Sequence, residues 1–159
     1  TALRAMLPQL LEKYDVIHIC GKGNLDESLA DTPGYRQYEF LSDGLRNLYA
    51  LADVVISRAG ANVICELLAL KKPNILIPLP LDQSRGDQIL NAESFEKQGF
   101  SYVLDQHAME KDSTLLSTAI ETVYAKRAQY IAAMEQSQQG NGVDQVIAVL
   151  REVVDSQKK

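Results

Sequence analysis

The sequence lacks an excess of basic residues, and this absence limits its partners. Its 159 residues hold 16 Lys and Arg against 21 Asp and Glu, which gives a formal net charge of −5 at pH 7. Nucleic-acid binding depends on Lys and Arg that neutralise phosphates, so no nucleic-acid partner is expected. The same balance argues, more weakly, against direct docking on an anionic membrane.

Cysteines and long apolar runs are also scarce. Cys20 and Cys65 have neither CxxC nor metal-ligand spacing. Both lie in segments expected to be buried, and we interpret them as reduced core residues of a cytoplasmic protein. No apolar run is long enough to span a bilayer, and we recognise no signal peptide.

Signatures of nucleophilic or metal-dependent catalysis are missing as well. Gly21-Lys22-Gly23 is not a P-loop, because the GxxxxGK[ST] pattern is absent. His18 lies within an expected strand and is interpreted as a core histidine, whereas His107 falls in an expected polar loop. No Ser/His/Asp, Cys/His or metal-ligand set has sensible spacing, so no metal or catalytic residue is assigned.

The chain is rich in alternating strand-like and helical segments, and 46% of its residues are hydrophobic. This predicts one globular domain over residues 1–155, with a frayed tail at 156–159. Expected strands cover residues 15–20, 35–40, 53–57, 74–78 and 101–104. Expected helices cover residues 2–13, 43–51, 61–70, 88–98, 113–130 and 143–154, with a break at 136–142. Apolar strands separated by helices predict an α/β, Rossmann-like parallel sheet with helices on both faces.

In such a sheet, ligands bind beyond the carboxyl ends of the strands. The first candidate there is Ser57-Arg58-Ala59-Gly60-Ala61-Asn62-Val63, which links a strand to a helix. Gly60 allows a tight turn and the close approach of a ligand, and the free N–H groups of the first helical turn suit a phosphate. An ordinary strand-to-helix turn has the same pattern, so the spacing alone leaves both interpretations open.

Glu66 strengthens the binding interpretation. It shares a helix face with Asn62 and Val63, one turn beyond the expected phosphate position. A carboxylate there can accept hydrogen bonds from both ribose hydroxyls. Apolar neighbours make this helix largely buried in our prediction, so the carboxylate needs a partner.

A second candidate follows the strand that ends at Pro78. Asp87 and Gln88 project from the first turn of a helix expected to start near Ser84, and their side chains suit sugar hydroxyls. Ser84 with Asp87 also resembles a capping box, which is an equally good explanation. A third, weaker candidate is Glu39-Phe40-Leu41, whose backbone could contact a flat base; Ser42 or Asp43 is the expected N-cap of the next helix.

Together these segments resemble the donor-binding domain of the family 28 glycosyltransferases, which have the GT-B fold. The blocks that carry the resemblance are His18-Ile-Cys-Gly-Lys-Gly23, Glu39-Phe-Leu41, Ala52-Asp-Val-Val-Ile-Ser-Arg-Ala-Gly-Ala61, Glu66, Pro78, Asp87-Gln88 and Asn91-Ala92. It extends over about residues 3–154. The block from Ser57 to Glu66 and its spacing to Asp87-Gln88 are its most specific part.

The resemblance implies a role for each site residue. The backbone at Leu41 would hold uracil, and the helix start at Gly60, Ala61, Asn62 and Val63 would face the diphosphate. Glu66 would bind the ribose, Asp87 and Gln88 would bind GlcNAc, and Arg58 would support the site. Family members commonly have two glutamine-like residues at this pair, so Asp87 leaves the identity of the sugar open.

The resemblance also implies the reaction and the parts that this chain lacks. UDP-GlcNAc would donate GlcNAc, with inversion and without a bound metal, to a lipid-linked muramoyl-pentapeptide in peptidoglycan synthesis. The family's first strand with its Gly-Gly-Ser loop, and its acceptor domain, are missing. This fragment alone is therefore expected to be inactive, and its parent enzyme to lie peripherally on the inner face of the cell membrane.

Three alternatives stay open at this stage. The acceptor could be another lipid-linked molecule, such as a diacylglycerol or a dolichol-linked sugar. The chain could instead be a non-catalytic, partner-dependent subunit, since some relatives divide the two halves between polypeptides. A UDP-GlcNAc 2-epimerase-like protein would need further acid/base carboxylates and histidines that the sequence does not supply.

Overall fold

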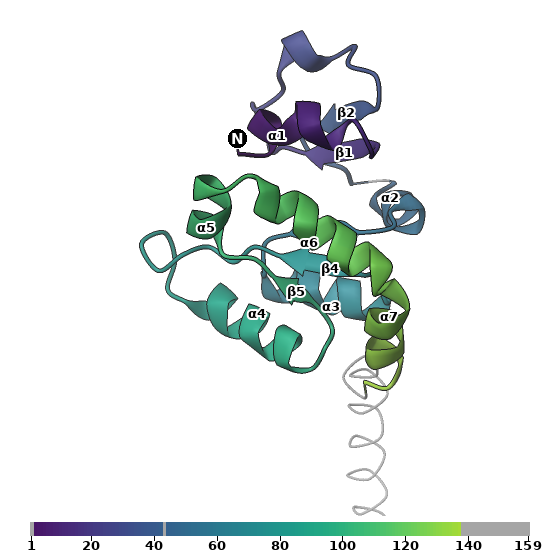
Figure 1. Ribbon diagram of the computed structural model, residues 1–159, viewed down its shortest axis with the longest axis vertical. Helices are drawn as coiled ribbons and strands as arrows, with labels where there is room; N and C mark the ends of the chain where they lie inside the picture. Colours follow the sequence, from purple (N-terminus) through teal and green to yellow (C-terminus); the bar gives the residue numbers. More distant parts are fainter. Residues whose placement is uncertain (1, 43, 138–159) are drawn as a thin grey trace, which may run out of the picture.

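A computed structural model describes residues 2–42 and 44–137 of the chain (Figure 1). Parallel strands alternate with helices, as the sequence predicts. The strands are β1 (Val16–Ile19), β2 (Tyr35–Tyr38), β3 (Val55–Ser57), β4 (Asn74–Leu76) and β5 (Tyr102–Val103). The α-helices are α1 (Ala2–Leu10), α2 (Leu45–Leu51), α3 (Ala61–Ala69), α4 (Asp87–Lys97), α5 (Gln106–Lys111), α6 (Thr114–Ala125) and α7 (Arg127–Glu135), with a short 3-10 turn η1 (Glu27–Leu29).

The described strands form two parallel sheets. One pairs β1 with β2, and the other has the order β3-β4-β5. In Figure 1, β1 lies on the side of its sheet nearer to β4. The described strands therefore form two sheets, not the single sheet that the sequence predicts.

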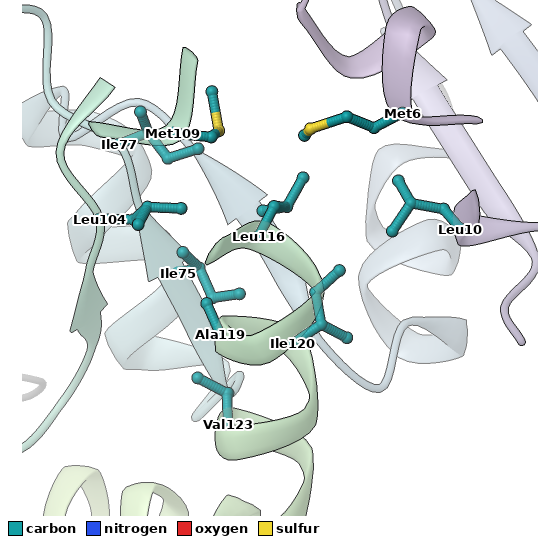
Figure 2. Close-up of a cluster of buried hydrophobic side chains, with 10 residues drawn as sticks. All are labelled: Met6, Leu10, Ile75, Ile77, Leu104, Met109, Leu116, Ala119, Ile120 and Val123. Carbon is teal, nitrogen blue, oxygen red and sulfur yellow. The ribbon is translucent and has the colours of Figure 1, made fainter. Parts of the chain in front are cut away.

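Helices cover both faces of the three-stranded sheet, which confirms the Rossmann-like prediction. On one face, α6 packs against β4, and Figure 2 shows Met6 and Leu10 of α1 pointing toward Leu116 of α6. On the other face, α3 and α4 pack around Leu76, and two phenylalanines of that cluster meet edge to face. Ile75 and Leu76 are consecutive in β4, so their side chains point to opposite faces of the sheet. Both are fully buried because helices cover both faces.

The carboxyl-terminal helices differ most from the prediction. The helix expected over residues 113–130 is interrupted at Lys126, whose backbone (φ −97°, ψ 11°) separates α6 from α7. Helix α5 was not predicted; Asp105 caps it by accepting a hydrogen bond from the Ala108 N–H at 2.8 Å. The helix expected at 143–154, most of the break at 136–142 and the tail at 156–159 lie outside the described residues.

The cysteines are free thiols, but the prediction that both belong to the core is wrong. Cys20 is half-buried at the end of β1, and Cys65 is exposed on α3. On α3 the buried side chains are Ile64, Leu67 and Leu68, and Cys65 lies on the opposite side of the helix. The described residues include no helix whose length and apolarity would allow it to cross a bilayer.

Replacing Leu116 with Ala tests the α1–α6 core. Leu116 is 2% exposed at the centre of the cluster, so Leu116→Ala should lower the free energy of unfolding by about 2–5 kcal/mol through lost burial and the cavity left behind. Leu51→Ala is the matched control, because Leu51 is also helical but 73% exposed. Chemical denaturation measures both. Equal losses for the two variants would contradict this packing.

Candidate functional site

The turns that follow β3 and β4 lead into α3 and α4, which puts the amino ends of both helices at the carboxyl edge of the three-stranded sheet. The turn after β3 is fixed from α4, where the Asn91 side-chain amide donates a hydrogen bond to the Ala59 carbonyl at 3.0 Å. Ala59 itself is fully buried. The backbone at the start of α3 is therefore held by the hydrogen bond from Asn91 and by the packing around Ala59.

The amino end of α3 carries no capping side chain. Its N-cap is Gly60, and no side-chain cap hydrogen bond is present there. Gly60 has an ordinary extended backbone (φ −69°, ψ 142°), so the tight turn expected to require glycine is not found. A Cβ at Gly60 would meet no atom within 4 Å, so the position is open. Ala61 and Asn62 are exposed and Val63 is half-buried, and the N–H groups of this first turn have no intrahelical partner.

Glu66 lies one turn further along α3, and the prediction of its burial is wrong. Its side chain is exposed, because Ile64, Leu67 and Leu68 provide the buried face of the helix. It does have a partner, Tyr49 of α2. Burial raises the pKa of the Tyr49 phenol above its usual value, and the charge and hydrogen bond of the adjacent Glu66 carboxylate raise it further. No pattern in the sequence singles out Tyr49 as this partner.

Arg58 ties together three neighbouring strand ends. Its Nη1 donates to the Ile77 carbonyl, just after β4, at 3.1 Å and to Gln106 Oε1, just after β5, at 2.7 Å. The Nε2 group of Gln106 donates in turn to Glu110 Oε1 at 2.8 Å. Arg58 therefore links the ends of these strands, in part through Gln106, a residue that the sequence analysis missed.

The loop after β4 presents Asp87 and Gln88 at the start of α4. Gln88 Oε1 accepts a hydrogen bond from the Leu79 N–H at 3.1 Å. The side-chain oxygen is therefore used within the loop, and the NH₂ group can still donate to a ligand. Asp87 is exposed in the first helical turn. The capping-box interpretation is wrong: the N-cap is Gly86 (φ +88°), and Ser84 Oγ donates to loop carbonyls instead.

The segment after β2 connects the two sheets. Leu41 is half-buried between β2 and α2. The Glu39 carboxylate accepts a hydrogen bond from the Gly23 N–H at 2.6 Å, which joins the loops after β1 and β2. The N-cap of α2 is Gly44, in the left-handed region at φ +103°, so the prediction of Ser42 or Asp43 as the cap is wrong. Asp43 itself lies outside the described residues.

Both histidines contact side chains of the chain itself. His18 is half-buried and its Nδ1 is 2.9 Å from the Tyr35 hydroxyl; burial lowers its pKa, and the charge of Arg4 lowers it further. His107, expected in a loop, belongs to α5 and lies 3.6 Å from carboxylate oxygens of Asp82 and Glu110. Within the described ranges, no group of three or more His, Cys, Asp and Glu residues could hold a metal ion.

The site thus combines three kinds of group at one edge: free N–H groups on α3, the guanidinium of Arg58, and exposed carboxylates at Glu66 and Asp87. The first two suit an anion such as a phosphate. The carboxylates suit neutral hydroxyl groups, which can donate to them. A ligand with both a phosphate and hydroxyl-bearing rings would match this set.

Comparison with known proteins identifies similar chains. A family model described as the glycosyltransferase family 28 C-terminal domain matches residues 1–150. The chain is 52% identical over 151 residues to the UDP-N-acetylglucosamine–N-acetylmuramyl-(pentapeptide) pyrophosphoryl-undecaprenol N-acetylglucosamine transferase of Lachnospira eligens, covering 95% of this chain and 42% of that protein. It is 53% identical over 152 residues to the protein of the same name from Lachnoclostridium phytofermentans, covering 96% of this chain and 42% of that protein.

A solved structure has the same fold. The crystal structure of Acinetobacter baumannii MurG matches with a TM-score of 0.72 and 23% sequence identity, over 95% of this chain and 46% of that one. At this identity the match concerns the fold. The chain therefore spans less than half the length of the proteins that it resembles.

The contact between Tyr49 and Glu66 can be tested by titration. Glu66→Gln removes a negative charge beside the phenol, which makes the phenolate less unfavourable, so the pKa of Tyr49 should fall toward its usual value of about 10. Burial should keep this pKa above that value. Ultraviolet absorbance of the phenolate measures the shift, with Tyr49→Phe subtracted to isolate the signal. Glu93→Gln, on the exposed side of α4, should change nothing; an unchanged pKa in Glu66→Gln would rule out the contact.

Proposed function

Because the chain belongs to the glycosyltransferase family 28 C-terminal domain family, we propose that it is the donor-binding domain of an enzyme that transfers GlcNAc from UDP-GlcNAc to a lipid-linked muramoyl-pentapeptide. The observation that carries this proposal is the uncapped amino end of α3, with Glu66 one turn further along the helix. The donor and the acceptor are those in the names of the two relatives from Lachnospira eligens and Lachnoclostridium phytofermentans.

In the proposed complex, the diphosphate of UDP lies at the amino end of α3. Its oxygens accept hydrogen bonds from the N–H groups of Ala61, Asn62 and Val63, and the open position at Gly60 admits them. The helix dipole contributes only about 0.3–1 kcal/mol at an exposed site. The charged guanidinium of Arg58 is therefore needed to add affinity for the phosphates.

The remaining groups divide the nucleotide sugar among them. Glu66, held by Tyr49, accepts hydrogen bonds from the ribose hydroxyls, and the backbone at Leu41 contacts uracil. On GlcNAc, Asp87 accepts hydrogen bonds. Gln88 donates through its NH₂ group, since its oxygen already accepts from Leu79.

The proposed reaction is an inverting transfer. The C4 hydroxyl of the muramoyl unit attacks the anomeric carbon of GlcNAc, the bond from that carbon to the β-phosphate oxygen breaks, and UDP leaves with the electron pair. The hydroxyl proton passes to a base on the acceptor domain. The free N–H groups of α3 stabilise the negative charge that develops on the diphosphate, which lowers the barrier without a metal.

The proposal requires further parts of an enzyme. The acceptor domain, in cis or in trans, supplies the base and the lipid-binding surface, and the whole enzyme works on the inner face of the cell membrane in peptidoglycan synthesis. One reading frame that encodes both halves would support a single enzyme. Co-purification of this chain with a separately encoded acceptor domain would instead identify a partner-dependent subunit.

The donor-binding role is tested by thermal and chemical unfolding with UDP. A ligand that binds only the folded state stabilises it by about 2.7 kcal/mol at 100 times its Kd. UDP should therefore raise the stability of the chain, and Glu66→Ala should remove most of that gain by deleting the ribose contact. Glu93→Ala, also helical and exposed, is the control and should keep full protection. Protection that is the same in wild type and Glu66→Ala would reject the assignment.

A further inference from the structure

We propose that Gln106 is a positioning residue: it orients the Arg58 guanidinium toward the diphosphate while leaving the positive charge of that group intact. The inference rests on the proposed function and adds a residue to its site. Gln106 opens α5 and is 9% exposed, and its Oε1 accepts from Arg58 Nη1 at 2.7 Å. The two residues are 48 positions apart in the sequence.

The hydrogen-bond count at Arg58 explains the orientation. Nη1 of an arginine carries two N–H bonds, and here one goes to the Ile77 carbonyl and the other to Gln106. Both hydrogens of Nη1 are thereby used by the protein. The guanidinium is planar, so fixing Nη1 at two points also fixes the plane in which Nε and Nη2 present their donors. The directions of the remaining donors are thereby fixed.

Gln106 itself is held in one orientation. Its Nε2 donates to Glu110 Oε1 at 2.8 Å, so the amide oxygen faces the cation and the amide nitrogen faces the carboxylate. The reverse orientation would place an NH₂ group against the guanidinium and an oxygen against the carboxylate, which is unfavourable at both ends. Glu110 therefore keeps the acceptor of Gln106 turned toward Arg58.

The choice of an amide has an electrostatic consequence. A carboxylate at position 106 could accept the same hydrogen bond, but it would form an ion pair with Arg58 and neutralise the charge that a diphosphate requires. The amide provides the contact without that neutralisation. Position and charge can therefore be varied separately, which allows a sharp test.

The test measures the Kd of the chain for UDP and for uridine, which lacks the phosphates, by NMR titration. Gln106→Leu removes the acceptor of the Arg58 hydrogen bond. It should weaken UDP binding about tenfold, which is the scale of one charge-assisted contact. Uridine binding should change less than twofold. Gln129→Leu, on the exposed side of α7, is the matched control and should bind both as wild type does. In an Arg58→Ala background, Gln106→Leu should cause no further loss of UDP affinity.

A second variant separates positioning from folding. The double substitution Gln106→Glu with Glu110→Gln keeps one donor and one acceptor at each contact, so the chain should unfold at a denaturant concentration close to that of wild type. UDP affinity should nevertheless fall, because Arg58 is now neutralised. Equal weakening of UDP and uridine by Gln106→Leu, additive losses with Arg58→Ala, or unchanged UDP affinity in the double variant would each overturn the inference. Failure of the wild-type chain to bind UDP would instead overturn the proposed function itself.

Discussion

The free N–H groups at the start of α3 are the feature on which the rest of the site depends. Three backbone donors in the first turn of any helix lack intrahelical partners and must find water, a side chain or a ligand. Among the described residues no side chain caps α3, and the residues that carry the donors are exposed or half-exposed. Water can therefore satisfy them at rest and be displaced by an anionic oxygen. The surrounding contacts hold the start of α3 in one position, so that its N–H groups stay in place when water is exchanged for an anionic oxygen.

Rigidity at this edge comes from contacts between neighbouring strand ends. The Asn91 amide fixes the Ala59 carbonyl from α4, and Arg58 reaches across to the ends of β4 and β5. Preorganised donors of this kind need little rearrangement when charge develops on a ligand, which is why they are effective in catalysis. On α2, Tyr49 lies next to the exposed Glu66 carboxylate, whose charge and hydrogen bond raise the pKa of the Tyr49 phenol further than burial alone.

Much of this arrangement can be predicted from the sequence, because apolar β-branched runs mark the strands and small residues mark the turn at Gly60. The errors have local causes. Cys65 and Glu66 were expected inside because their neighbours are apolar, but a helix against one sheet face buries only one side. The partners of Arg58 and Glu66 could not be predicted, since Gln106 and Tyr49 are brought near by the fold rather than by spacing.

Because the proposed site has residues from both sheets, it depends on the contacts that hold the two sheets together. In the proposed function, uracil contacts the segment that follows β2, and the phosphates contact the segment that follows β3. One nucleotide therefore spans both sheets. Those sheets share no ladder, and Ile17 and Ile19 of β1 are 46% and 45% exposed, although parallel strands are normally covered on both faces. Packing of Met6 and Leu10 of α1 against α6 joins the two sheets instead. In the proposed function, nucleotide affinity therefore depends on this hydrophobic interface as well as on the polar groups that contact the ligand.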